Sequence, residues 1–191
     1  MQPFKTELNL ANGVITPADK VLRRRLSDMR GMYADDDAAR RLADGEGDRL
    51  IYEVYVVDLP EEAGQILHST TVIHPGRIGD EYHMTKGHFH VLRDRAEIYV
   101  GLAGEGCLLM QLDGGAVSTL AMQPGTIAYV PPYWGHRTIN TGSVPFVFLA
   151  AWPGDSGHDY GTIEQQGFAQ ILVERNGVPT LVPNPKWKPG A

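Results

Sequence analysis

Cysteine is almost missing from this sequence: Cys107 is the only one, so no disulfide can form within a single copy of the chain. A chain that does not depend on disulfides fits a reducing compartment, and we predict a cytoplasmic protein. Cys107 lies in the apolar run of residues 106–110, which favours a small buried side chain over a reactive thiol.

Long apolar stretches and an excess of basic charge are missing as well. No run of residues approaches the length of a membrane span, and we expect no secretory leader at the N-terminus. The net charge of −6 gives no basic field for nucleic acid or an anionic membrane surface. We therefore expect neither as a partner, and an anionic small substrate would need a local group of donors to hold it.

Glycine and proline are plentiful: 22 glycines and 13 prolines punctuate short apolar runs along 191 residues. Frequent turns between short segments favour a β-rich sandwich or barrel, and the length suits one domain with a modest appendage. From residue 49 the apolar pattern alternates, which predicts strands. The predicted strands cover residues 49–57, 67–73, 96–100, 101–111, 118–122, 126–130, 136–140, 144–152, 171–174 and 178–182. Residues 76–86 read as a loop.

The predicted organisation is an N-terminal extension at residues 1–48, a barrel at 49–183 and a loose tail at 184–191. A helix is expected over residues 16–29, because Thr16 and Pro17 are typical of a helix start. Leu22, Leu26 and Met29 then recur at helical spacing. Arg23, Arg24 and Arg25 would occupy the opposite face, for which solvation is a simpler interpretation than contact with a phosphate. Asp35, Asp36 and Asp37 would cap a second short helix through Leu42.

Four side chains with the chemistry of metal ligands stand out: His88, His90, Glu97 and His136. Alternate residues of a strand face the same side, so His88 and His90 would point at one place. Glu97 lies in the next predicted strand, and His136 follows a strand closed by two prolines. Three imidazoles and a carboxylate leave one or two positions open on an octahedral divalent ion, which favours a catalytic site over a structural one.

Two glycine-punctuated blocks around these ligands resemble the motifs of the cupin superfamily. The first block runs from His88 to Gly104, and the second comprises Gly125, Pro131, His136 and Asn140. The resemblance implies a mainly β fold, a double-stranded β-helix or jelly-roll barrel, with a short N-terminal helical segment. Two departures mark a subfamily. Six residues separate His90 from Glu97, and Tyr133 stands where the second motif usually has glycine.

A closer resemblance extends over nearly the whole chain, from about residue 20 to the 180s. The segments 79–90, 94–99, 129–140 and 157–163, together with 24–29, are similar to the cupin-type, or archaeal-type, glucose-6-phosphate isomerases. That family implies interconversion of glucose 6-phosphate and fructose 6-phosphate in glycolysis and gluconeogenesis. It also implies one divalent metal ion, most commonly iron(II), with manganese, nickel or zinc as substitutes.

Residue roles carry over from the family by position. The implied metal ligands are His88, His90, Glu97 and His136. The implied substrate contacts are Tyr52, Thr71, Thr85, Gly87, Tyr99, His158 and Tyr160, and Lys86 beside them is a natural point charge for phosphate. Glu97 and His158 are the expected catalytic residues. Trp152 departs from the tyrosine that family members often have, so a hydroxyl is missing there.

Two reaction routes remain open. A base, with Glu97 as the first candidate, takes the C2 proton through a cis-enediol, or a hydride moves directly between the two carbons. The proton route is the one we predict. Two other functions share the four ligands, a cupin dioxygenase and a non-catalytic sugar-phosphate sensor or storage cupin. The hydroxyl-rich neighbours Thr85, Tyr99 and Tyr160 favour a sugar substrate. We expect a homodimer, on fold analogy.

Overall fold

Antiparallel strands make up most of the regular secondary structure in the computed structural model, which describes residues 2–190. Met1 and Ala191, the ends of the predicted extension and tail, lie outside the described residues. The largest sheet has six strands in the order β11-β8-β13-β5-β4-β3. Their bounds, in that order, are Ile127–Val130, Glu97–Ala103, Phe146–Pro153, Ile66–Ile73, Leu50–Val56 and Lys20–Arg25.

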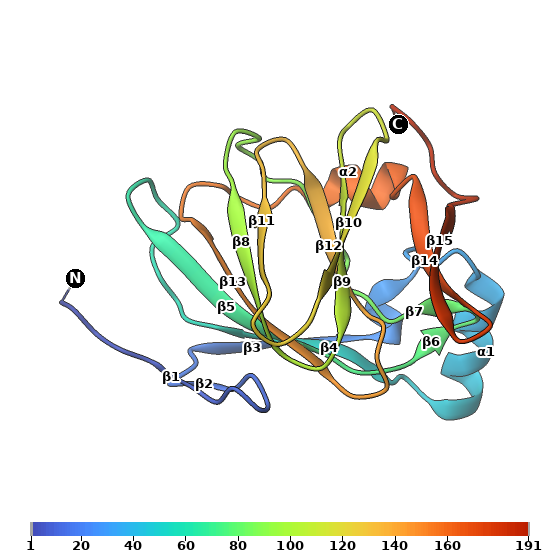
Figure 1. Cartoon of the computed structure of the whole chain (residues 1–191), viewed down its shortest axis with the longest axis horizontal. Coiled ribbons are helices and arrows are strands. Elements are labelled where there is room, and N and C mark those ends of the chain that lie inside the picture. The colour runs from blue at the N-terminus through green and yellow to red at the C-terminus, as the bar shows by residue number, and fades with distance from the viewer. Residues whose placement is uncertain (1, 191) are drawn as a thin grey trace.

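Three smaller sheets complete the β structure (Figure 1). A three-stranded sheet has the order β10-β9-β12, formed by Val117–Met122, Gly106–Gln111 and Gly135–Asn140. A four-stranded sheet has the order β15-β14-β7-β6, formed by Val178–Pro183, Gln170–Arg175, Glu81–Tyr82 and Arg77–Ile78. The short strands β1 (Glu7–Leu8) and β2 (Ile15–Thr16) pair with each other.

One apolar core joins the six-stranded and three-stranded sheets. Phe146 and Phe148 of β13 belong to the same buried cluster as Leu108 of β9 and Ile139 of β12. Phe89 is fully buried among them. Alternating side chains on two sheets that share a core are the arrangement of a β-sandwich or jelly roll. This arrangement confirms the predicted mainly β, cupin-type barrel.

Two helices lie at the end of the molecule that also carries β6, β7, β14 and β15 (Figure 1). Helix α1 (Asp36–Glu46) begins where the Asp35 carboxylate accepts the Ala38 amide at 2.7 Å, which confirms the predicted capping. Helix α2 (Tyr160–Gln166) begins at Asp159, whose carboxylate accepts the Thr162 amide at 3.1 Å. The sequence had not indicated α2.

The helix predicted over residues 16–29 is wrong. Lys20–Arg25 is strand β3, paired with β4 from Lys20 opposite Val56 to Arg25 opposite Leu50, with a shift of register between Arg24 and Arg25. Its backbone hydrogen bonds therefore go to a neighbouring strand, and only Leu26–Met29 forms a short 3₁₀ helix, η1. The expected loop at residues 76–86 contains the two short strands β6 and β7.

Cys107 is buried in β9 and unpaired, as expected of a small core residue. The cytoplasmic location inferred from it stays a prediction. None of the helices in the described part of the chain has the length and apolar composition of a membrane-crossing helix. Along residues 184–190, Lys186 donates to the Tyr33 carbonyl and the Lys188 amide donates to the Gln166 carbonyl.

Candidate metal centre and pocket

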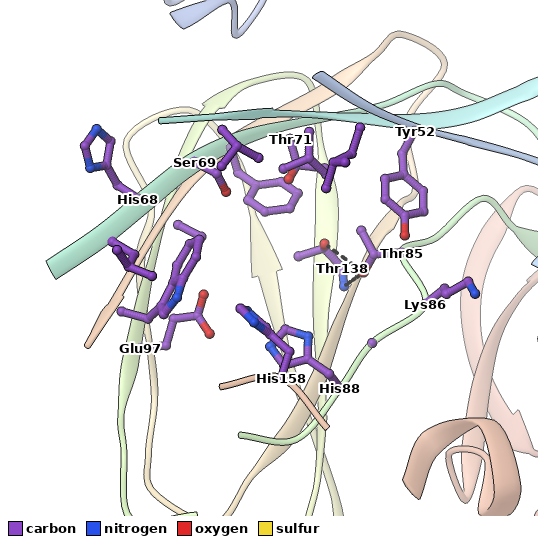
Figure 2. Close-up of a pocket in the computed structure, with 18 of the residues that line it drawn as sticks. Tyr52, His68, Ser69, Thr71, Thr85, Lys86, His88, Glu97, Thr138 and His158 are labelled. Atoms are coloured by element: carbon purple, nitrogen blue, oxygen red, sulfur yellow. Dashed lines mark hydrogen bonds between the residues drawn. The ribbon is translucent and has the colours of Figure 1, made fainter. Parts of the chain in front are cut away.

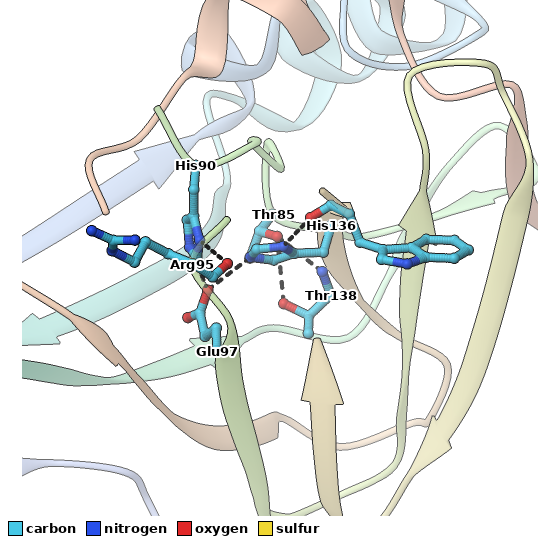
Figure 3. Close-up of polar contacts among 7 residues, drawn as sticks. Thr85, His90, Arg95, Glu97, His136 and Thr138 are labelled. Atoms are coloured by element: carbon cyan, nitrogen blue, oxygen red, sulfur yellow. Dashed lines mark hydrogen bonds and ion pairs between the residues drawn. The ribbon is translucent and has the colours of Figure 1, made fainter. Parts of the chain in front are cut away.

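Four polar side chains converge inside the barrel: His88, His90, Glu97 and His136 (Figure 3 shows the last three). One ligand atom from each lies within 4.8 Å of all the others. Glu97 opens β8, and His136 is the second residue of β12. The segment carrying His88 and His90 is extended, although the pattern predicted a full strand and the structure has only isolated bridges.

Alternating partners keep both of these histidines on one side of that segment. His88 exchanges backbone hydrogen bonds with His136 at 3.1 and 2.9 Å. Phe89 exchanges them with Asp159 at 3.1 and 2.8 Å. Because the backbone is bonded first to one neighbour and then to the other, the Phe89 side chain enters the core while the flanking imidazoles face the cluster.

The outer ring nitrogens of two histidines are held by backbone carbonyls. His90 Nδ1 lies 2.9 Å from the Arg95 carbonyl, and His136 Nδ1 lies 3.2 Å from the Trp134 carbonyl. A proton on each Nδ1 satisfies these contacts and leaves a lone pair on each Nε2. Those Nε2 atoms lie 3.1 and 2.9 Å from Glu97 Oε2.

A single divalent cation would satisfy all of these facing groups at once. The His88 Nε2 atom is also buried and has no hydrogen-bond partner among the described residues. Three neutral imidazoles and one carboxylate at this separation form the donor set of a borderline divalent metal ion. The residues present therefore fit a resident metal.

Electrostatics favour the protonation states that a metal requires at His88 and Glu97, whereas Glu97 raises the pKa of His90 against the effect of burial, so a metal ion bound there would displace a proton. Burial and the neighbouring histidines hold the pKa of His88 well below its usual value. Burial on its own would raise the pKa of Glu97, but the adjacent His136 and His90 lower it to about 2. Near neutral pH, His88 is then neutral and Glu97 is ionised.

A salt bridge behind the cluster fixes the segment between His90 and Glu97. Arg95 donates from Nε and Nη2 to both oxygens of Asp155, at 3.0 and 2.8 Å. The Arg95 carbonyl, which orients His90, is held in place by this bidentate pair. The six-residue gap that departs from most cupins thus forms a loop with its own anchor.

The backbone at Tyr133 accounts for the second departure from the cupin motif, a tyrosine where glycine is usual. Its φ angle is 73°, in the left-handed region where glycine is the usual residue. Its amide donates to the Arg93 carbonyl at 2.6 Å, and its side chain is exposed. The turn therefore keeps the glycine-like backbone without the glycine.

A pocket of about 400 Å³ opens beside the four-residue cluster (Figure 2). All of the substrate contacts implied by the sequence line it: Tyr52, Thr71, Thr85, Lys86, Gly87, Tyr99, His158 and Tyr160. Glu97, His88 and His136 line it too, so the cluster borders the cavity. Strands β4 and β5, which carry Tyr52 and Thr71, lie on one side, as Figure 2 shows.

Aromatic rings surround His158. It meets His88 edge-on at 4.5 Å and Trp152 edge-on at 5.5 Å, and it stacks on Tyr160 at 5.9 Å between ring centroids. Burial lowers its pKa, so the ring is neutral near pH 7. Trp152, which lacks the tyrosine hydroxyl, instead supplies a wall for His158.

The turn at residues 85–88 is fixed from behind. Arg137, which is buried, donates to the Lys86 carbonyl at 2.7 Å, and the Thr138 amide donates to the Thr85 hydroxyl at 3.1 Å. Gly87 has a φ of 78°, and a Cβ there would come within 2.9 Å of Arg137 Cβ. Lys86 Nζ lies 3.3 Å from a Glu164 oxygen, so its charge is paired.

Sequence reasoning missed several polar residues of the pocket, among them Thr138 and Arg24. Thr138 of β12 lies 3.4 Å from the Thr85 hydroxyl, oxygen to oxygen. Arg24 lines the pocket from β3, although the helix interpretation had placed it on a solvated face. An alternating reading of residues 20–25 is the signal that could have found it, because Lys20, Leu22 and Arg24 share one face of a strand.

Comparison with known proteins points to one family. The glucose-6-phosphate isomerase (GPI) family model matches residues 23–185. The glucose-6-phosphate isomerase of Pyrococcus horikoshii is 49% identical over 187 residues, covering 98% of each chain. That of Thermococcus litoralis is 49% identical over 187 residues, covering 98% of this chain and 97% of the relative. That of Sinorhizobium medicae is 36% identical over 176 residues, covering 92% and 82%.

Similarity to solved structures is weaker. An oxalate decarboxylase from Lactobacillus farciminis, solved as a formate complex, aligns with a TM-score of 0.45 and 20% identity. The alignment covers 57% of this chain and 30% of that one. At this level the similarity carries no functional argument.

Proposed function

Because the chain belongs to the glucose-6-phosphate isomerase family, we propose that it interconverts glucose 6-phosphate and fructose 6-phosphate. This aldose–ketose isomerisation is a step shared by glycolysis and gluconeogenesis. It moves one hydrogen between C1 and C2 while the carbonyl and hydroxyl exchange places. The identity of nearly half of the residues along nearly the whole length of the Pyrococcus relative supports the proposal.

The proposal includes one divalent metal ion held by His88, His90, Glu97 and His136. The observation that carries it is the convergence of one ligand atom from each of these four side chains within 4.8 Å of one another. Iron(II) is the proposed ion, with manganese, nickel and zinc as alternatives that suit the same donors. When bound, such an ion supplies polarisation of the sugar carbonyl and stabilisation of negative charge on its oxygen.

The chain's own residues would bind the rest of the sugar phosphate. The hydroxyls of Tyr52, Thr71 and Thr85 and the backbone at Gly87 suit the phosphate, with Lys86 as a nearby positive charge. Tyr99 and Tyr160 present hydroxyls for the sugar. Binding energy from the phosphate end would orient the reacting carbons at the opposite end.

We propose proton transfer through a cis-enediol, with Glu97 as the base and His158 as the group that holds a proton while the sugar ring opens. A carboxylate with a pKa of about 2 is a weak base, so the proton that it removes must be acidified by the polarised carbonyl next to it. Turnover in heavy water checks this route. Deuterium at C2 of glucose 6-phosphate or at C1 of fructose 6-phosphate supports it, and full retention of hydrogen shows a hydride shift instead.

A coupled fructose 6-phosphate assay tests function and metal together. The chelator-stripped protein should be inactive and should recover with iron(II) or manganese. His136→Ala should not recover, whereas His74→Gln, a matched control outside the pocket, should behave like the wild type. Activity that survives chelation in both wild type and His136→Ala would refute the metal proposal. Absence of isomerisation with every one of the four ions would refute the proposed reaction.

We further propose a homodimer, formed through an exposed apolar face of the six-stranded sheet. Ile127 and Tyr129 on the outermost strand β11 are 72% and 56% exposed, and Ile98 of β8 pairs with Tyr129. These side chains lie on one face because alternate residues of a strand point the same way. Clustered exposed apolar side chains on an outermost strand favour pairing with a second copy.

A further inference from the structure

Strand β3 presents three consecutive arginines to different surroundings. Arg23 Nε lies 2.9 Å from a Glu53 carboxylate oxygen, and Arg25 donates to the Asp48 carbonyl at 2.7 Å. Both of these side chains are exposed. Arg24, between them, points the other way, is half-buried and lines the pocket. Because side chains alternate along a strand, only the middle arginine of the three points into the pocket.

Arg24 lies among the hydroxyls at one end of the pocket. It is the register partner of Tyr52 across the β3–β4 pair. Burial raises the pKa of Tyr52 to about 12, and the nearby Arg24 guanidinium acts against that rise. The backbone at Lys86 acts against that rise as well. The Tyr52 side chain therefore lies between the Arg24 guanidinium and the turn at residues 85–88.

The charge on Arg24 is not compensated. None of the carboxylates whose side chains the structure describes lies within ion-pair distance of it. Lys86, the cation that the sequence favoured for phosphate, is already paired with Glu164 at 3.3 Å. Withdrawing a charged guanidinium from water costs free energy unless an opposite charge lies nearby. Arg24 is partly withdrawn without such a partner, and this favours the binding of an anion beside it.

We propose that Arg24 binds the phosphate of the sugar phosphate and is the residue that selects phosphorylated over free sugars. This assignment rests on the proposed function for the identity of the sugar. The planar guanidinium offers two parallel N–H donors to a phosphate, and the Tyr52 and Thr85 hydroxyls supply further donors beside it. Lys86 has a smaller part, because a phosphate must compete with Glu164 for it.

Kinetics and phosphate inhibition of the metal-loaded enzyme test the assignment. Arg24→Gln should raise the KM for fructose 6-phosphate about 10- to 100-fold, as expected for the loss of charged hydrogen bonds, and change kcat much less. The inhibition constant of inorganic phosphate should rise by a similar factor. Arg23→Gln, on the same strand but facing outward, is the control and should leave both constants unchanged. Arg24→Lys should fall between wild type and Arg24→Gln.

The outcomes separate this assignment from the proposed function. An active wild type whose Arg24→Gln variant keeps both constants within about twofold overturns the role of Arg24. A larger effect from Lys86→Gln than from Arg24→Gln overturns it as well. If the protein shows no isomerase activity but calorimetry detects binding of inorganic phosphate that depends on Arg24, the phosphate site is supported and the proposed reaction is overturned. Should Arg24→Gln fail to fold, Arg24→Lys against Arg23→Lys gives the same comparison.

Discussion

Replacing Gly87 by alanine adds one methyl group at a confined point of the pocket wall. The new Cβ would lie 2.9 Å from Arg137 Cβ, from the His136 carbonyl oxygen and from Phe168 Cε2. Two of these neighbours belong to β12, whose backbone is paired with β9 and cannot give way cheaply. The φ of 78° adds a second penalty, because an L side chain is strained there.

The two penalties have separate magnitudes. A left-handed backbone costs a non-glycine residue about 1–2 kcal/mol. Overpacking against a fixed wall costs about 1–3 kcal/mol. We therefore expect Gly87→Ala to lower the free energy of unfolding by about 2–5 kcal/mol. Because the turn must shift to relieve the contacts, the Thr85 hydroxyl and His88 move with it, and isomerase activity should fall.

Gly177→Ala is the matched control. Gly177 has a φ of 79° in the turn between β14 and β15, and nothing lies within 4 Å of its would-be Cβ. It should show only the backbone penalty and full activity. Urea unfolding of both variants measures the difference, which isolates the steric part. Equal losses of stability in the two variants, with activity kept in Gly87→Ala, would refute the reasoning.

Three further predictions concern the metal, pH and assembly. Adding iron(II) or manganese at about 100 times its dissociation constant should stabilise the fold by about 2.7 kcal/mol, seen as a rise in Tm that His136→Ala abolishes. A Tm in the wild type that ignores chelator would contradict it. Burial lowers the pKa of His83 to about 4, so its neutral form contributes stability above pH 6.5 that is lost as the pH falls toward 4. His83→Gln should therefore gain about 2–3 kcal/mol relative to wild type between pH 7 and pH 4, and parallel urea titrations with no such gain would exclude this effect. Ile127→Lys should convert the dimer to a monomer in size-exclusion chromatography with light scattering, and an intact dimer would rule out this face.

The sequence was sufficient to predict β4, β5 and the strands from β8 to β15, and to single out the four clustered side chains. Alternating apolar runs such as residues 50–56 and 66–73 fold as strands because both the local pattern and the core agree. His88, His90, Glu97 and His136 were visible because their chemistry is unusual on such strands. Their convergence within 4.8 Å depends on which strands are neighbours, which only the three-dimensional fold defines.

Residues 16–29 and Tyr160–Gln166 show where sequence reasoning failed. The first segment carries a helix-like spacing of Leu22, Leu26 and Met29, but pairing with β4 satisfies its backbone better. The second segment is a helix of seven residues, too short for a periodic pattern to identify. Arg24 was missed because its orientation follows from the strand that replaced the predicted helix.

Strand β3 is the outermost strand of its sheet, joined to the rest only through β4 among the described strands. Boundary strands of this kind open more readily than central ones, and their amides exchange sooner with solvent. Opening of β3 would carry Arg24 away from the cavity while His88, His90, Glu97 and His136 stayed in place. Warming should then weaken the affinity for sugar phosphates before the metal ion is released. Opening of the outer strand β3 would therefore limit the temperature range of the enzyme, while the metal ligands were still in place.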